Sequence, residues 1–317
     1  MKHNVFVIND SGASLPEAKR LEDADNRIEV AFHIEYNKNK HYCDDPTMSD
    51  KELLKGFLDL PVVSTDDKQK FLQNLKNRGI DVSTAQPNVG EYLTAYKKAA
   101  KLGATAILAV PMSRELSGSI KSAEQAIDLF MQERVTKGYY EIPVKIAEYI
   151  NSVSMVQGMK VLEAEKLAKD GLSIDEIKET VESDDHPIHA IEIVSDLKQL
   201  RKGGRIGRAQ HMVGGILGIK PILTIRDGVL DPLDKKKIKG WENAIEHSLE
   251  YIYQQVGKSA VRASFVQFES KDEHVTYLYN RAHEYFDIQE ETKSKQCYVL
   301  NAHTGTNILG IAVQEMS

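Results

Sequence analysis

The densest group of side chains able to do chemistry is Ser113-Arg114-Glu115-Leu116-Ser117-Gly118-Ser119, directly after the apolar run ATAILAVPM. Three hydroxyls and a guanidinium at the start of a predicted helix favour an anion, because the first turn of a helix offers free N–H groups and the positive end of the helix dipole. The alternative is structural, with Ser117 or Ser119 capping the helix. The local sequence leaves both open.

A second candidate is Arg205, which follows the glycine pair Gly203-Gly204. Its planar guanidinium suits a carboxylate or a phosphate through paired donors. The alternative is a helix end followed by a solvated arginine. The run Lys235-Lys236-Lys237 is by itself typical of a solvated surface.

His303, within NAHTGTN, is predicted to lie on a polar turn between apolar runs, where it can face a cleft. TAQPNVGEY (84–92) is either a helix entry or a loop that holds one end of a ligand. No Ser–His–Asp order, Cys–His pair, metal-ligand spacing or phosphate loop is recognisable. These residues indicate anion-binding loops without a catalytic set, which favours a binding protein with no catalytic residue, metal or cofactor.

Composition limits the class of protein. The 317 residues suffice for two domains, and 41% hydrophobic with 28% charged residues is a globular balance. A net charge of -6 argues against nucleic acid. Cys43 and Cys297 are too few for a disulfide scaffold and fit the reducing cytoplasm. The first apolar run is too short for a signal peptide, and no run is long enough to span a membrane.

Strand, polar loop and helix alternate through the first ~150 residues, which predicts a parallel α/β sheet. VFVIND is a predicted strand that ends at Asp10, residues 17–27 and 51–78 are predicted helices, and 28–36 is a predicted strand. Because ligands of such sheets lie beyond the carboxyl ends of the strands, the loops at Asp10 and Ser113 should share that edge, and Thr84 can join them.

The second half mixes helices with the predicted strands HAIEIV, KPILTI and SAVRASFVQF, and RDG predicts a hairpin turn. CYVLNAHTGTNILGIAV is predicted to close the chain as two strands around a polar turn. The rhythm of elements changes near residues 150–160, which we take as the boundary between two domains, 1–155 and 156–317.

Taken in order, six blocks of the sequence resemble the DegV family of bacterial fatty-acid-binding proteins. The blocks are DSGASLP (10–16), TAQPNVGEY (84–92), SRELSGS (113–119), SVSMVQG (152–158), LRKGGRIGRAQHMVGGILGIKPILTIRDGVLDP (200–232) and HTGTNILGI (303–311). The resemblance implies a parallel α/β N-terminal domain and a mixed-sheet α/β C-terminal domain, with the ligand site between them.

The same resemblance implies a long-chain fatty acid whose tail is enclosed in an apolar tunnel. Thr84 would bond its carboxylate, helped by Ser113, Arg114, Ser117 and Gly118. Arg205 and His303 match family positions near the carboxylate, and an ungapped count places a further family arginine at Lys237. Members of this kind present the acid to a separate ATP-dependent fatty acid kinase, which makes an acyl phosphate, so the carrier itself needs no catalytic group.

Departures from the family pattern leave two other functions open. Ala85 and Asn88 replace serines, Arg114 replaces the second serine of its block and is a candidate partner of the carboxylate, and residues 44–80 form a longer segment that would suit a lid or an interaction surface. A divergent paralogue would bind another lipid or act only as a partner protein. A hydrolase or transferase would use Ser113 or Ser117 with His303.

Overall fold

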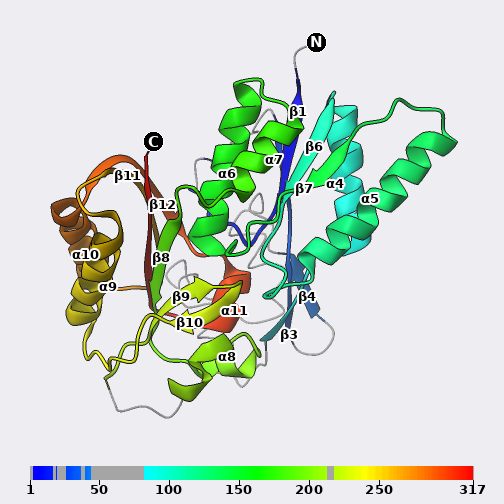
Figure 1. The fold of residues 1–317 in the computed structure, drawn as a ribbon. Helices are drawn as coiled ribbons and strands as arrows, with labels where there is room; N and C mark the ends of the chain where they lie inside the picture. The colour runs from blue at the N-terminus through cyan, green and yellow to red at the C-terminus, as the bar shows by residue number, and fades with distance from the viewer. Residues whose placement is uncertain are drawn as a thin grey trace.

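The computed structural model describes residues 3–16, 19, 26–36, 40–43, 82–212 and 218–316. Two large sheets, each with its own helices, lie side by side, and the short helix α11 (Tyr298–Thr304) lies between them (Figure 1). The segments 51–78 and 44–80 fall outside the described residues. Of the predicted helix at 17–27 only Lys19, Asn26 and Arg27 are described: Lys19 is helical, Asn26 lies in a turn, and Arg27 begins a strand.

The first sheet has four parallel strands in the order β2-β1-β6-β7. They are β1 (Val5–Asp10), β2 (Arg27–Val30), β6 (Ala106–Val110) and β7 (Val144–Ile146). Every residue of β1 and β6 is buried, which explains why both are apolar except for Asn9 and Asp10 at the end of β1. The predicted parallel α/β architecture of the first half is confirmed.

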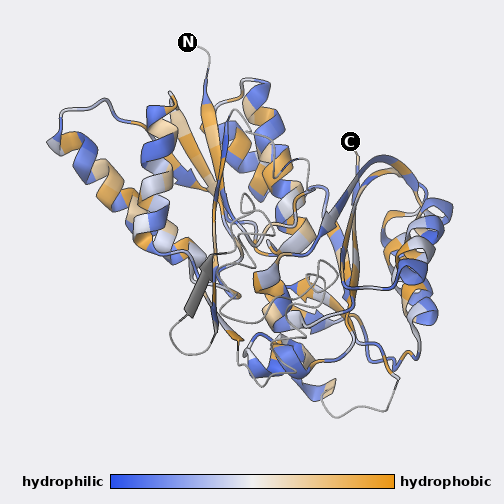
Figure 2. Ribbon diagram, turned by 180° about the vertical axis from the view of Figure 1, so that it is seen from behind, coloured by the Kyte–Doolittle hydropathy of each residue, from blue (hydrophilic) through white to orange (hydrophobic). Residues whose placement is uncertain are grey.

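Helices cover both faces of this sheet. They are α4 (Val89–Lys101), α5 (Ser119–Thr136), α6 (Ser154–Lys169) and α7 (Ile174–Glu182). Because side chains alternate along a strand, Phe6 and Ile8 pack with α4 and α5, whereas Val5 and Val7 pack with α6 and α7. Figure 2 shows the apolar strands between helices whose outer faces are hydrophilic.

The second sheet has six strands in the order β10-β9-β8-β13-β11-β12. They are β8 (Ile188–Ile193), β9 (Ile222–Arg226), β10 (Val229–Pro232), β11 (Ala260–Phe268), β12 (Asp287–Lys295) and β13 (Ile308–Glu315). Only the pair β11 and β12 is parallel, so the sheet is mixed, as predicted. The β9–β10 pair confirms the hairpin predicted from RDG.

One face of the second sheet packs on α9 (Trp241–Val256) and α10 (Asp272–Tyr285), and its other face looks toward α6 and α11. The short helix α8 (Lys198–Lys202) and the 3-10 helix η2 (Gly207–Met212) lie at one end (Figure 1). No helix among the described residues is long and apolar enough to cross a membrane.

A small antiparallel sheet, β4-β3-β5, links the halves. It is made of β3 (His33–Tyr36), β4 (Lys40–Cys43) and β5 (Val82–Ala85). Although these strands belong to the first half of the chain, Ile34 packs with Val194, Leu197 and Leu200 of the second. The small sheet is therefore a wall shared by both halves.

Two predicted elements were wrong. The single strand predicted at 28–36 is broken into β2 and β3, because Phe32 donates its N–H to the Ser11 hydroxyl and the chain leaves the first sheet there. The strand predicted just before the final turn is helix α11 instead. Asn301 bonds the carbonyl of Cys297 within this helix, and Gly305, at φ +87°, ends it.

The chain passes from the first sheet to the second after α7, between Glu182 and Ile188. The predicted boundary at 155/156 falls instead at the start of α6. This helix contributes Val161 and Ala164 to the core of the first sheet, and Met155 and Met159 to a cluster with the second.

Candidate functional site

A cavity of about 250 Å³ lies between the two sheets, at the small end of the range for ligand pockets. Its walls come from both halves and are mostly apolar. Apolar lining residues are Phe32, Met112, Leu116, Val153, Met155, Val156, Ala190, Ile191, Leu200, Leu223, Ile225, Leu230, Val299 and Leu300. Of the eight residues predicted from the sequence, four line this cavity: Thr84, Ser117, Arg205 and His303.

Thr84 and His303 meet although 219 positions separate them, with 2.7 Å between Thr84 Oγ1 and His303 Nε2. Thr84 is on β5 of the small shared sheet, and His303 is in the last turn of α11. The two segments are brought together because β5 and α11 pack against one another. The interface between the halves thus creates the pair.

His303 is enclosed and neutral. Burial, and then the nearby charge of Arg205, lower the pKa of its imidazole from 6.5 to about 4. Its Nδ1 is buried and has no hydrogen-bond partner within the described part of the chain. That nitrogen lies so close to Gly203 that an added Cβ there would approach it to 2.2 Å, so only glycine fits. In the tautomer that carries its proton on Nε2, the atom without a partner in the described residues is Nδ1, which is then a hydrogen-bond acceptor.

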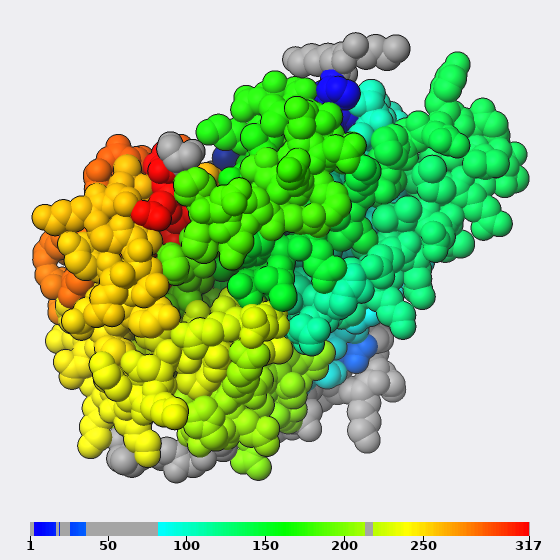
Figure 3. All heavy atoms as spheres, in the orientation of Figure 1, coloured from blue at the N-terminus to red at the C-terminus, as the bar shows by residue number. Residues whose placement is uncertain are grey.

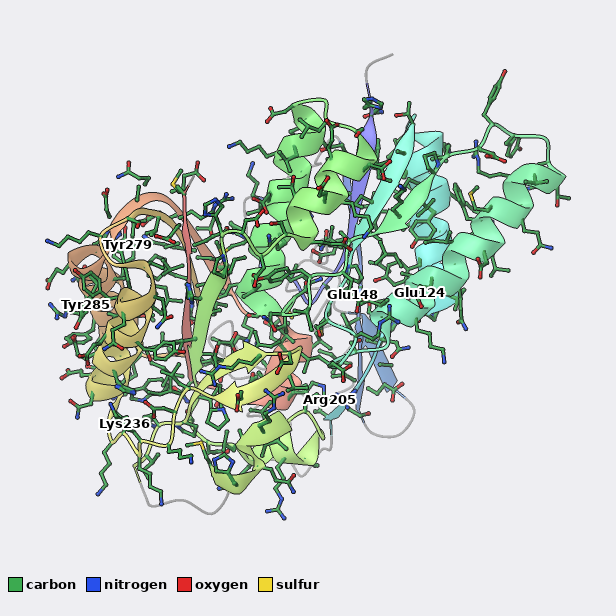
Figure 4. The ribbon with its side chains drawn as sticks, in the orientation of Figure 1. Glu124, Glu148, Arg205, Lys236, Tyr279 and Tyr285 are labelled. Atoms are coloured by element: carbon green, nitrogen blue, oxygen red, sulfur yellow. The ribbon has the colours of Figure 1, made fainter. Side chains whose placement is uncertain are left out.

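Arg205 lies at the mouth of the cavity, between α8 and the first half (Figure 4). Its side chain is exposed and, among the described residues, hydrogen-bonds two carbonyls: Nη1 donates to Gly203 at 2.8 Å and Nε more weakly to Leu116 at 3.4 Å. The turn that aims it needs Gly204, at φ +71°. The positive charge of Arg205 is therefore not balanced by any carboxylate in the contacts that its guanidinium makes in the described chain.

The loop 113–119 supports the mouth from the first half. Ser117 lines the cavity, and its hydroxyl accepts the N–H of Ser119, the first residue of α5, at 3.2 Å. The N-cap of α5 is Gly118, so neither Ser117 nor Ser119 is the capping residue considered above. Ser113 Oγ instead donates weakly to the carbonyl of Gly228 in the β9–β10 turn, at 3.4 Å, and so ties the loop to the second half. Figure 3 shows yellow second-half residues bordering directly on green first-half residues.

The segment TAQPNVGEY both begins helix α4 and lines the cavity. Asn88 and Glu91 form a capping box for α4, with Asn88 Oδ1 accepting the N–H of Glu91 at 3.1 Å. Thr84, Ala85 and Gln86 line the cavity. Gly118 does not line it but makes room for Gln86, whose amide would lie 2.4 Å from an added Cβ.

The carboxyl end of β1 holds these loops in place through Asp10. Its carboxylate accepts the N–H groups of Gly12 and Met112 at 3.2 and 2.9 Å, the hydroxyl of Ser119 at 2.6 Å and the amide of Gln157 at 2.8 Å. Burial raises the pKa of Asp10, and these four bonds oppose that shift. Asp10 is absent from the cavity lining and is a support for the loop.

Besides Ser113 and Gly118, two further predicted residues, Arg114 and Lys237, lie outside the cavity lining. Arg114 Nη2 bonds Glu124 and Glu148 at 2.8 and 2.9 Å on the surface of the first half (Figure 4). Lys237 lies in the exposed run before α9, where its neighbour Lys236 is seen far from Arg205 in Figure 4. The structure therefore brings neither residue to the Thr84–His303 pair.

Among the described residues, His303 is not hydrogen-bonded to Ser113 or Ser117, as a serine hydrolase would require. His303 Nε2 bonds Thr84, while the hydroxyls of Ser113 and Ser117 bond Gly228 and the Ser119 N–H. No group of three or more His, Cys, Asp or Glu side chains in the described ranges is arranged to hold a metal.

The sequence interpretation missed polar residues on the far wall, chiefly Glu192 of β8 and Gln296 before α11, both of which line the cavity. A signal existed for Glu192. It is a charged residue between the apolar Ile191 and Ile193 of the strand HAIEIV, and burying such a group is costly.

Comparisons with known proteins agree with this architecture. The family model described as "Uncharacterised protein, DegV family" matches residues 61–316. A DegV domain-containing protein of Staphylococcus aureus strain N315 is 27% identical over 245 residues, which cover 77% of this chain and 82% of the relative. A similar protein from Clostridium perfringens is 27% identical over 246 residues, 78% of this chain and 83% of the relative.

Two solved structures share the fold. "Fatty Acid Binding of a DegV family Protein from Thermus thermophilus" has a TM-score of 0.78 at 22% identity, covering 99% of this chain and 100% of that one. DegV of Bacillus subtilis, described as a fatty acid binding protein, has a TM-score of 0.76 at 22% identity with the same coverage. At this identity the likeness establishes the fold, and the bound fatty acids are properties of those proteins.

Proposed function

Since this chain belongs to the DegV family, we propose that it binds a long-chain fatty acid in the cavity between its two sheets and presents the carboxylate to a separate kinase. The observation that supports this most is the layout of the cavity, whose apolar walls lead to the group Thr84, His303 and Arg205. Such a cavity suits a ligand that is apolar along its length and anionic at one end.

The tail supplies the affinity in this proposal. Each buried CH₂ contributes roughly 0.8 kcal/mol, so a chain of about 16 carbons contributes on the order of 10 kcal/mol before the costs of binding. Because the described cavity is only about 250 Å³, we expect the walls to adjust when the longest chains bind.

The carboxylate would be held by a relay of hydrogen bonds. With its proton on Nε2, His303 donates to Thr84 Oγ1 and leaves the threonine hydroxyl free to donate to the ligand. Arg205 brings a positive charge that its present carbonyl contacts do not neutralise. A buried carboxylate is tolerated when it gains both hydrogen bonds and a counter-charge.

Presentation to a kinase requires that the carboxylate be reachable, and the exposure of Arg205 at the mouth supports this. The kinase would transfer the γ-phosphoryl group of ATP to a carboxylate oxygen, giving an acyl phosphate and ADP. Because ATP is the donor, we place the protein in the cytoplasm. This chain holds and orients the acid, and the chemistry belongs to the kinase.

Native mass spectrometry of gently purified protein tests the binding step. We expect an added mass of a fatty acid, and rebinding of acids of about 14 to 18 carbons after delipidation, at submicromolar Kd. Protein that stays empty after incubation with these acids would refute the proposal. A different co-purified lipid would identify a divergent paralogue.

The presentation step is tested by adding ATP and a purified fatty acid kinase to the loaded protein and trapping the acyl phosphate with hydroxylamine. We expect a hydroxamate that forms only when all three components are present. Arg205→Ala should reduce its yield, whereas Arg114→Ala, an arginine away from the cavity lining, should not. No hydroxamate from wild-type protein with an active kinase would count against this step.

A further inference from the structure

The wall that the second sheet contributes to the cavity holds a second polar group, on elements different from those of Thr84, His303 and Arg205. Glu192 on β8 accepts a hydrogen bond from Gln296 Nε2 at 3.1 Å, and the hydroxyl of Ser154 at the start of α6 lies near enough to oppose the rise in the pKa of its carboxyl group. All three side chains line the cavity.

The second sheet is built to turn Glu192 inward. Glu192 lies opposite Gly310 of β13 and Leu223 of β9, on the face that looks toward α6. A Cβ at position 310 would lie 2.8 Å from Met155 Cε and 3.0 Å from Glu192 Cγ, so glycine there makes room for both. Neighbouring lining residues such as Ala190 are apolar, and a leucine at 192 would continue the pattern of an acyl tunnel.

A carboxyl group in this position costs free energy unless it is hydrogen-bonded. Glu192 is half-buried and lines the cavity. Burial raises the pKa of Glu192, which favours the neutral acid, a group that both donates and accepts.

The polar neighbours of Glu192 already have other hydrogen-bond partners. Gln296 donates to Glu192 and accepts from Thr304 Oγ1 at 3.1 Å, so both ends of its amide are used. Ser154 is also within 3.2 Å of Ser14 Oγ. Within this group, the carboxyl of Glu192 is the part that faces the cavity with capacity for a further hydrogen bond, since it has two oxygens.

We propose that the cavity selects an acyl chain that carries a hydroxyl group, which hydrogen-bonds Glu192 while the ligand carboxylate lies at Thr84 and Arg205. This rests on the proposed function and deepens it, because it names the class of fatty acid. A plain acyl chain would bury the carboxyl of Glu192 against CH₂ groups and lose whatever hydrogen bond it makes to water.

Both ends of this arrangement are fixed, because Thr84 is on β5 and Glu192 is on β8. A hydroxyl at one position along the chain would reach Glu192, and hydroxyls elsewhere would be buried without a partner. Selectivity should therefore peak at one hydroxyl position, which a generally sticky apolar cavity would not produce.

The experiment compares octadecanoic acid with a series of its monohydroxy derivatives, the hydroxyl being placed at successive carbons, by calorimetric titration of delipidated protein. We expect one derivative to bind about tenfold more tightly than the parent acid, the effect of one well-made hydrogen bond to a buried group. Glu192→Leu should reduce that ratio to about one or below, with the parent acid binding at least as well as before.

Two further variants keep the test decisive. Glu192→Gln retains the size and hydrogen-bonding capacity of the side chain, so it should fold and keep a reduced preference. Glu179→Leu makes the same exchange on the exposed face of α7 and should leave the preference unchanged. A parent acid that binds as tightly as every hydroxylated derivative would overturn the inference and leave the proposed function intact. Failure of all the acids to bind would overturn both.

Discussion

Two polar groups, the Asp10 network and the group Thr84, His303 and Arg205, differ in how many of their polar atoms have hydrogen-bond partners within the described chain. Asp10 is fully buried, and four donors meet its carboxylate. The second group, Thr84 with His303 and Arg205, lines the cavity. Within the described ranges, the buried Nδ1 of His303 has no hydrogen-bond partner, and the guanidinium of Arg205 bonds only carbonyls.

This difference distinguishes a group that stabilises the fold from a group that can bind a ligand. A saturated network has no capacity for a ligand, so Asp10 contributes to stability by holding the loops that follow β1 and β6. A group with spare donors and an unbalanced charge is less favourable in the empty protein and gains when an anion arrives. Substitutions should therefore move stability at Asp10 and affinity at Arg205.

The largest effect is expected from Asp10→Ala. It leaves four donors without an acceptor, which should lower the free energy of unfolding by about 3–5 kcal/mol. Urea denaturation at pH 7 measures the change. Asp128→Ala, on the exposed side of α5, is the matched control and should change stability by no more than ~0.5 kcal/mol. A loss below ~1 kcal/mol for Asp10→Ala would show that the network is not a support.

Arg205→Ala should have the opposite profile. Because the side chain is exposed and its contacts are two carbonyls, unfolding should change by no more than ~0.5 kcal/mol. Loss of a charge-assisted bond to the carboxylate should weaken fatty acid binding roughly 10- to 100-fold in titration calorimetry. Unchanged affinity with a large loss of stability would show that Arg205 supports the fold and does not bind the ligand.

The pH dependence of stability should reveal His303. Its pKa is lowered from 6.5 to about 4 in the folded protein, so the unfolded chain binds the proton first as the pH falls. Stability is retained above the unfolded pKa and is lost as the pH falls toward the folded one. Between pH 7 and pH 5 the wild type should lose about 2 kcal/mol more than His303→Gln.

The comparison with His303→Gln isolates this residue from the other titrating groups. Bound fatty acid should reduce the difference, because a carboxylate beside the ring favours its protonated form. Parallel pH curves for the two proteins would mean that His303 is not held neutral by its surroundings.

The smallest effects are expected at the residues outside the cavity lining. Arg114→Ala removes surface ion pairs with Glu124 and Glu148, which are worth ~1 kcal/mol or less. Both Arg114→Ala and Lys237→Ala should leave fatty acid affinity within about twofold, as measured by the same titration. A tenfold loss in either variant would place a second cation at the head group and restore the role that the family pattern suggests for these positions.

The predictable part of the molecule is the part encoded locally. Buried strands such as β1 and β6 are apolar over most of their length, and the turn at Asp227-Gly228 is marked by its own residues. The glycine pair before Arg205 likewise marks a local feature, because Gly203 ends α8 and Gly204 takes a positive φ, and Arg205 then lines the cavity.

What escaped prediction depends on partners distant in sequence. The direction of Arg114 is set by Glu148, 34 positions away, which turns it to the surface. The break between β2 and β3 depends on a contact between Phe32 and Ser11. The apolar stretch YVLNA gives no sign that α11 rather than a strand brings His303 to Thr84, because short apolar runs do not distinguish the two.

Because the small shared sheet and α6 join the two halves, cutting the chain between the predicted domains would disrupt both. A cut at 155/156 would uncover Ile34 on one fragment and Leu197 on the other, and it would take α6 from the sheet that it covers. It would also leave Thr84 on one fragment and Arg205 with His303 on the other. Neither fragment alone would hold a carboxylate, so a fatty acid would bind only the reassembled pair and would favour it by mass action. The protein is thereby suited to fragment complementation, in which the lipid itself reports reassembly.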